Sequence, residues 1–120
     1  MLDPWTRLSL TGRLTADPEL RSTHSGASVG QLRLAVPRRR GRDGEDRGAV
    51  FVDVVTFGRL AESCGEYLAQ GRQVAVSGRL ELDEWEAEDG TRRQRHKVVA
   101  EEVEFLGGRR QGDDGEEASS

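Results

Sequence analysis

The chain has 120 residues, enough for one domain and a short appendage, and its 18 basic and 22 acidic side chains leave a formal net charge of −4. This balance excludes a uniformly basic surface and at first argues against a nucleic-acid-binding protein. Its apolar runs are too short for a membrane span, its first residues lack a secretory signal, and its single cysteine, Cys64, excludes an intrachain disulfide. We therefore expect a cytoplasmic protein.

Two strands are predicted in the first third of the chain. Leu8, Leu10 and Leu14 alternate with polar residues over positions 7–15, which is typical of a half-buried strand, and Gly12 within it indicates a bulge or a bend. The Asp-Pro pair at positions 17–18 predicts a turn. A second alternating segment predicts a strand over residues 31–36, and the glycine-rich charged segment 38–48 that follows is expected to be a loop.

A third strand and a helix are predicted in the middle of the chain. Residues 49–57 are rich in β-branched and aromatic side chains, which favour a strand. Over residues 59–68, Leu60, Cys64 and Leu68 recur four positions apart and form one apolar stripe, which predicts a helix that Gly71 would terminate. Because Cys64 lies on this stripe, we expect it to be a small core residue and not a nucleophile.

Two long strands and a tail are predicted in the last part. One strand runs from about residue 73 to 85, Asp89 and Gly90 indicate the tip of a hairpin, and the return strand covers residues 93–106. Residues 107–120 are polar, show no hydrophobic periodicity and are predicted to form a disordered acidic tail. The expected organisation is therefore one domain over residues 1–106 and a tail over residues 107–120.

Five strands with one helix between the third and the fourth predict a fold class that is all-β with one helix. The order fits a five-stranded Greek-key barrel of the oligonucleotide/oligosaccharide-binding type, the OB-fold. Periodicity alone does not exclude another small α+β barrel.

Several stretches of the chain can be compared with a known family. Residues 10–21 read LTGRLTADPELR, residues 54–62 read VVTFGRLAE, residues 71–80 read GRQVAVSGRL and residues 98–106 read VVAEEVEFL. Together with EYL at 66–68, Trp85 and the turn at Asp89 and Gly90, this set resembles the bacterial single-stranded DNA-binding proteins, in order and spacing, over about residues 6–106. The resemblance implies an OB-fold that binds single-stranded DNA without strong sequence preference, usually as a homotetramer, in replication, recombination and repair.

Three aromatic side chains are candidates for stacking on bases. Alternation along the third strand places Phe51, Asp53, Val55 and Phe57 on one face. The resemblance implies that Phe51 and Phe57 stack on bases, whereas composition alone leaves open that both are core residues. Trp85 lies among acidic residues near the hairpin tip and matches a base-stacking tryptophan of the family, with packing at an interface as the alternative.

Arginines are the candidate phosphate contacts. The loop after the second strand carries a cluster suited to phosphates, with a merely solvated loop as the alternative: Arg38, Arg39, Arg40 and Arg42. The resemblance implies a DNA contact for Arg59 at the start of the helix. Arg33 and Arg79, on outward strand positions, are further candidates.

Two features depart from the family pattern. The fourth strand reads ELDE at residues 81–84, where the family often has basic residues, so we expect weaker but salt-sensitive binding unless Arg92, Arg93 and Arg95 on the return strand offset the charge. The end of the sequence is acidic but lacks the family's terminal hydrophobic residues, so recruitment of replication and repair partners through it is doubtful. This difference points to a specialised or secondary paralogue or to a truncated chain.

Catalysis finds little support in the sequence. His24 and His96 have no neighbours at metal-ligand spacing, and no phosphate-binding glycine motif follows a strand, so we expect no enzyme activity, metal or cofactor. Two other functions stay open: a protein-interaction OB module of the primosome-accessory type with incidental nucleic-acid affinity, and an RNA chaperone. A nuclease that uses the acidic hairpin and a metal is the least supported alternative.

Overall fold

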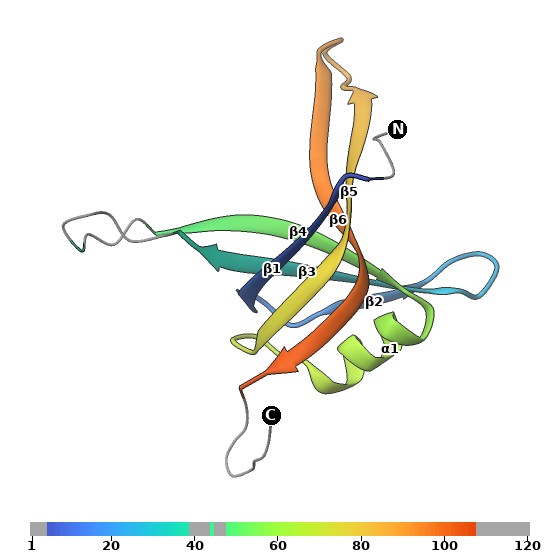
Figure 1. Cartoon of the computed structure of the whole chain (residues 1–120). Coiled ribbons are helices and arrows are strands. Elements are labelled where there is room, and N and C mark those ends of the chain that lie inside the picture. Colours follow the sequence, from blue (N-terminus) through green and yellow to red (C-terminus); the bar gives the residue numbers. More distant parts are fainter. Residues whose placement is uncertain (1–4, 39–43, 45–47, 108–120) are drawn as a thin grey trace.

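Six strands and one helix make up the described part of the chain, which covers residues 5–38, 44 and 48–107 of this computed structural model (Figure 1). In chain order the elements are β1 (Arg7–Leu14), β2 (Glu19–Ser22), β3 (Ser28–Pro37), β4 (Ala49–Phe57), α1 (Gly58–Tyr67), β5 (Gln73–Glu86) and β6 (Arg92–Leu106).

Five of the strands close into a barrel. The sheet order is β1-β5-β6-β4-β3-β2, and an additional pairing of β1 with β3 closes the ring. The contact between β4 and β6 is parallel, and the other pairings are antiparallel. This arrangement confirms the predicted OB-fold, whose five strands are β1, β3, β4, β5 and β6. The helix follows the third strand of the barrel, which is numbered β4 because β2 precedes it.

The short strand β2 was not predicted from the sequence. It pairs only with β3, Glu19 lying opposite Gln31, and all four of its residues are exposed. A strand with no buried face shows no alternation of polar and apolar residues, so the sequence indicated only the turn before it. Leu20 rests against α1, where a Cβ added to Gly65 would lie 3.4 Å from the Leu20 side chain.

The core fills the barrel and one side of α1. Each barrel strand contributes inward-facing aliphatic side chains, among them Leu14, Leu34, Val54, Val76 and Val98, all at most 2% exposed. The helix closes this core with the residues of its predicted stripe, of which Cys64 is fully buried. The prediction that Cys64 is a core residue is therefore confirmed.

The ends of the helix differ slightly from the prediction. It begins at Gly58 and ends at Tyr67, one residue earlier at each end than the apolar stripe indicated. Leu68 caps it in an extended conformation and donates its N–H to the carbonyl of Cys64 at 3.0 Å. Gly71 lies in the turn that leads into β5, with φ of +91°, so it does not terminate the helix as predicted.

Two glycines mark close approaches between strands. The pairing of β1 with β5 runs without a register shift through Gly12, so no bulge occurs there. Gly12 is required because a Cβ would lie 2.8 Å from the backbone oxygen of Ala35 on β3. The bulge lies instead between β5 and β6, where Ser77 is opposite Glu102 but Gly78 is opposite Ala100.

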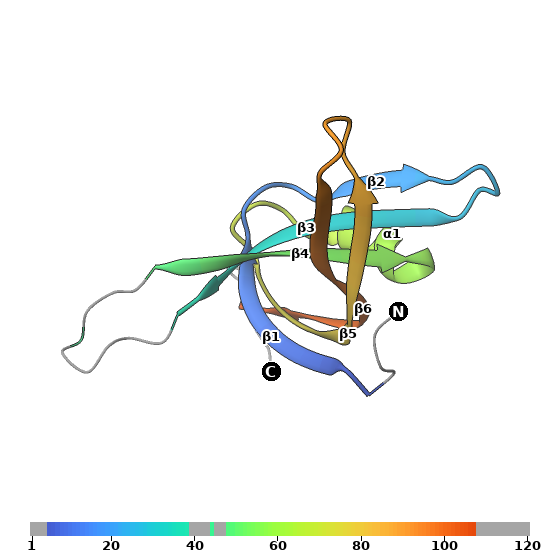
Figure 2. The same cartoon turned by 90° about the horizontal axis from the view of Figure 1, so that it is seen from above.

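The outer half of the β5–β6 hairpin extends away from the barrel (Figures 1 and 2). Its tip is at the predicted position: Gly90 has φ of +85°, and Ala87 donates its N–H to the carbonyl of Thr91 at 2.8 Å. The Asp89 carboxylate accepts hydrogen bonds from the hydroxyl of Thr91 at 2.7 Å and from its N–H at 3.0 Å. These bonds favour the charged form and lower the pKa of Asp89.

Candidate nucleic-acid interface

The two faces of β4 differ in exposure, although Val55 on the face of the phenylalanines is only 9% exposed and Val50 on the barrel face is 44% exposed. Val54 and Thr56 are buried in the barrel, whereas Phe51 and Phe57 are 56% and 52% exposed. The alternative that both phenylalanines belong to the core is therefore wrong. Their stacking on bases stays a prediction.

The register of the sheet connects this side of β4 to the hairpin through Val55 and Val99, which are only 9% and 8% exposed. Val55, on the same side of β4 as the two phenylalanines, is opposite Val99 of β6. Six positions before Val99, Arg93 is opposite Trp85 of β5, whose side chain is 46% exposed. Opposed residues, and residues an even number of positions apart along a strand, point to the same side. Phe51, Phe57 and Trp85 thus share one side of the sheet, which we name the aromatic face.

Arg33 enters the aromatic face from β3, where it is opposite Asp53. Its Nη1 donates a hydrogen bond to Asp53 Oδ1 at 2.8 Å. Its guanidinium carbon lies over the ring of Phe51, 5.4 Å from the ring centroid. One arginine therefore contacts both a carboxylate and a candidate stacking ring.

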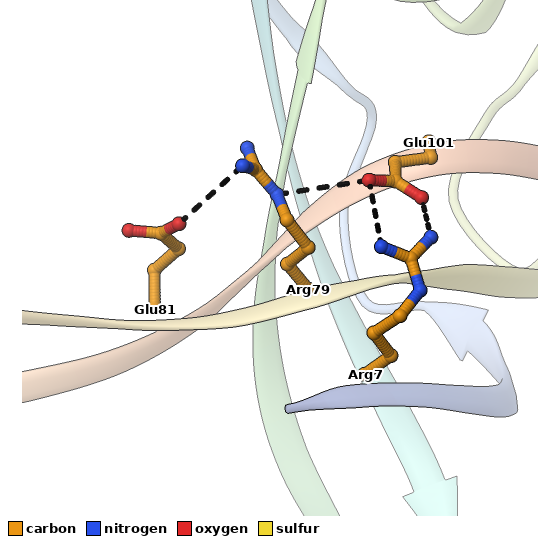
Figure 3. Close-up of polar contacts among 4 residues, drawn as sticks. All are labelled: Arg7, Arg79, Glu81 and Glu101. Carbon is orange, nitrogen blue, oxygen red and sulfur yellow. Dashed lines mark hydrogen bonds and ion pairs between the residues drawn. The ribbon is translucent and has the colours of Figure 1, made fainter. Parts of the chain in front are cut away.

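Arg79 is held by two carboxylates (Figure 3). Its Nε lies 3.7 Å from Glu101 Oε2, and its Nη1 lies 3.9 Å from Glu81 Oε2. Arg7 of β1, opposite Arg79, forms an ion pair with the same Glu101, including a contact of 3.3 Å from Nη1 to Oε2. Two arginines directly opposite each other repel, so the shared carboxylate offsets an unfavourable pair.

The bulge in β6 makes this bridge possible. Because Gly78 is opposite Ala100 while Ser77 is opposite Glu102, Glu101 is the extra residue of β6 that has no opposing residue on β5. Its side chain reaches both arginines from this position, as Figure 3 shows.

The charges of the hairpin are distributed between its two sides. The register places two acidic and three basic side chains of the hairpin on the aromatic face: Glu81, Asp83, Arg93, Arg95 and Lys97. Glu84 and Glu86 point to the opposite side, where Glu84 lies 3.8 Å from Arg92. The predicted acidic wall is therefore divided, and the side that carries Trp85 holds more cations than anions.

The remaining predicted cations are placed differently. Arg38 and Arg59 are exposed, and neither has an ion-pair partner within residues 5–38, 44 and 48–107. Arg38 lies at the end of β3, where its N–H donates to the carbonyl of Gly48 at 2.9 Å, and Arg59 is in the first turn of α1. Arg39, Arg40 and Arg42 lie outside the described residues.

Sequence reasoning missed the acidic partners of these arginines. Alternation placed Asp53 on the face of the two phenylalanines, so this signal was present, but the identity of its partner depends on the register with β3. Glu101 could not have been assigned, because the bulge that positions it breaks the alternation of β6. The contribution of Lys97 also depended on the register between β5 and β6.

The described residues offer few groups for catalysis or metal binding. They contain no group of three or more histidine, cysteine, aspartate or glutamate side chains placed to hold a metal ion. Burial raises the pKa of the Cys64 thiol from 9.0 to about 11, which keeps it protonated and unreactive at neutral pH. Within the same part of the chain, no helix has the length and apolar character needed to cross a membrane.

Comparison with known proteins identifies the family. The sequence pattern of the single-strand binding protein family matches residues 5–106. The chain belongs to this family. The single-stranded DNA-binding protein of Clostridium tetani is 46% identical over 101 residues, covering 83% of this chain and 69% of that protein. Single-stranded DNA-binding protein 2 of Staphylococcus aureus is 45% identical over 100 residues (83% and 71%). The single-stranded DNA-binding protein of Wolinella succinogenes is 38% identical over 121 residues (97% and 75%).

Membership confirms the resemblance that the sequence motifs indicated. The single-strand binding protein family is a non-enzymatic family of DNA-binding proteins, and its match extends over the whole barrel, from the residues before β1 to the end of β6. The aromatic face lies entirely within the matched residues.

Proposed function

We propose that this protein binds single-stranded DNA on the aromatic face, without strong sequence preference and without catalysis. The observation that carries the proposal is the placement of Phe51, Phe57 and Trp85, all about half exposed, on one continuous side of the sheet. Exposed rings stack on any base, at about 1–3 kcal/mol per base. Family membership, and relatives named as single-stranded DNA-binding proteins, support the same function.

We propose that arginines around the aromatic face contact the phosphates of the bound strand. Arg59 lies in the first turn of α1, where a cation is unfavourable beside the positive end of the helix dipole. A phosphate bound there would be attracted by both the guanidinium and the dipole. Arg38 at the end of β3 and Arg95 on the hairpin are exposed cations, and Arg39, Arg40 and Arg42 stay predicted contacts.

In a cell, we propose that this binding protects exposed single strands in the cytoplasm, in association with the nucleoid, during replication, recombination and repair. A homotetramer is the proposed assembly. Light scattering after size exclusion, with and without oligo-dT, tests it: a mass about four times that of one chain is expected, and a monomer in both samples would exclude it.

The test of the proposed function is fluorescence polarisation of labelled oligo-dT. Trp85→Ala is expected to weaken binding by about 1–3 kcal/mol, the contribution of one stacked base. Tyr67→Ala is the matched control, because Tyr67 is also an exposed aromatic residue but lies on α1. Equal binding by wild type and Trp85→Ala would refute the role of Trp85, and equal affinity for oligo-dT and its duplex would refute single-strand binding.

Three further measurements separate the alternatives. Competition between oligo-dT and a matched RNA strand distinguishes DNA binding from an RNA chaperone, which would prefer RNA. Capture of protein partners in the absence of DNA, together with no measurable affinity for oligo-dT, would favour an interaction module. Incubation of DNA with magnesium or manganese tests the nuclease alternative, for which strand cleavage would be required.

A further inference from the structure

The cluster of Arg33, Asp53 and Phe51 contains a negative charge, which is unexpected on a DNA-binding surface. Asp53 is a carboxylate on the aromatic face, two positions from Phe51 along β4. It is the less exposed partner of its ion pair, with 33% of its side chain accessible against 54% for Arg33. A free carboxylate in this position would repel the phosphates of a strand bound there.

The geometry shows what the carboxylate does in the folded protein. A long arginine side chain on an exposed strand samples many rotamers, and fixing it costs conformational entropy. The 2.8 Å hydrogen bond from Arg33 Nη1 to Asp53 Oδ1 fixes the end of this side chain. In that position the guanidinium lies over the Phe51 ring, where a cation–π contact is favourable.

We propose that Asp53 is a positioning residue that holds the Arg33 guanidinium over the Phe51 ring, so that the guanidinium extends the stack of the ring and offers its outer plane to a base. The inference rests on the proposed function, because it assigns a role within single-stranded DNA binding. An arginine plane stacks on bases as an aromatic ring does. Asp53 therefore strengthens DNA binding through Arg33, although its own charge opposes it.

If Asp53 has the opposite role and weakens DNA binding, its removal should change the affinity in the opposite direction. If Asp53 only neutralises Arg33 and keeps it from phosphate, its removal frees a cation and strengthens binding, with a salt dependence steeper by about 0.7 per additional phosphate contact. If Asp53 positions Arg33 for stacking, its removal weakens binding to bases while the salt dependence stays unchanged.

The decisive experiment compares Asp53→Ala with Glu19→Ala. Glu19 is an ideal control, because the register of β2, β3 and β4 places it on the same side of the sheet as Asp53, and it also pairs with an arginine, Arg21, at 3.6 Å. We expect Asp53→Ala to bind labelled oligo-dT about two- to fivefold more weakly than wild type, which corresponds to the loss of one exposed contact between the Arg33 guanidinium and a base, of the strength of a cation–π contact. Glu19→Ala should bind equally or more tightly.

Three further arms test the route through Arg33 and the base. In an Arg33→Ala background, Asp53→Ala should leave affinity unchanged or raise it, because the positioned group is absent. On an oligonucleotide of equal length that carries abasic spacers, the loss caused by Asp53→Ala should disappear. Circular dichroism of each variant verifies folding, and Arg33→Lys, which keeps the charge without the plane, should also weaken binding to oligo-dT.

The outcomes separate this inference from the function on which it rests. Absence of oligo-dT binding by folded wild type would overturn both. Binding by wild type with equal or tighter binding by Asp53→Ala would overturn the positioning role alone. An equal loss on oligo-dT and on the abasic strand would also overturn it, because stacking requires a base.

Discussion

The Lys97 ammonium lies 3.0 Å from a carboxylate oxygen of Asp83, on the side of the hairpin that carries Trp85. Lys97 is the only lysine of the chain and is about one-quarter exposed, so its four-carbon stem lies partly covered by the hairpin. The pair neutralises one of the two acids that the aromatic face receives from β5.

Replacing Lys97 by Gln is expected to weaken binding to oligo-dT about two- to fivefold at low salt, because Asp83 then presents an unpaired negative charge beside the proposed DNA path. Asp83→Asn should bind oligo-dT more tightly than wild type, and Lys97→Arg should bind as wild type does. Titrations of the three variants at two salt concentrations measure this. Tighter binding by Lys97→Gln would contradict the assigned DNA path.

Glu101 is predicted to lower the availability of two arginines for phosphate. Glu101→Gln removes the charge that holds Arg7 and Arg79. Unlike Arg33, neither of these arginines has a cation–π contact within residues 5–38, 44 and 48–107. We therefore expect the variant to bind oligo-dT more tightly, with a salt slope steeper by about 0.7 for each new phosphate contact. Plots of log affinity against log salt measure the slope. An unchanged slope would place both arginines outside the DNA path.

Gly78 is predicted to be essential for stability. A Cβ at this position would come within 2.1 Å of the Val99 backbone oxygen, a contact that only a backbone shift could relieve. Gly78→Ala should therefore lower the free energy of unfolding by at least about 1–3 kcal/mol. The control is Gly65→Ala on α1, where the nearest atom belongs to a Leu20 side chain at 3.4 Å and the gain in helix propensity is up to about 1 kcal/mol. Urea denaturation measures both, and equal midpoints would show that the bulge adapts.

The raised pKa of the Cys64 thiol is expected to make the folded protein less stable at alkaline pH. Burial raises its pKa to about 11 in the folded protein against 9.0 ordinarily, so the folded state binds this proton more tightly than the unfolded state. The contribution is fully present below pH 9 and is lost as pH rises toward 11. Denaturation midpoints of wild type and Cys64→Ala between pH 8 and 11 should therefore converge. A parallel decline in both proteins would exclude Cys64 as the source.

Much of the fold could be predicted because local patterns and tertiary packing agree. The alternation of β4 separated Phe51 and Phe57 from the core strand face, the four-residue spacing of Leu60, Cys64 and Leu68 located α1, and the Asp89–Gly90 pair located the hairpin tip. Each of these signals is contained in a few consecutive residues, and the barrel uses each of them unchanged.

The charge of the surface was decided only by the tertiary structure. The net charge of −4 at first argued against DNA binding, and the acidic fourth strand predicted weaker binding, but the sequence could not show which acids face which bases. That depends on register across strands far apart in the chain, since a shift of one residue moves every side chain to the other face. The pairing of β5 with β6 places Glu84 and Glu86 opposite Trp85's side, and a single bulge delivers Glu101 to two arginines. The sequence alone therefore indicated the barrel and placed Phe51 and Phe57 on one face of β4, whereas the tertiary structure decided that their rings are exposed and the register determined their electrostatic environment.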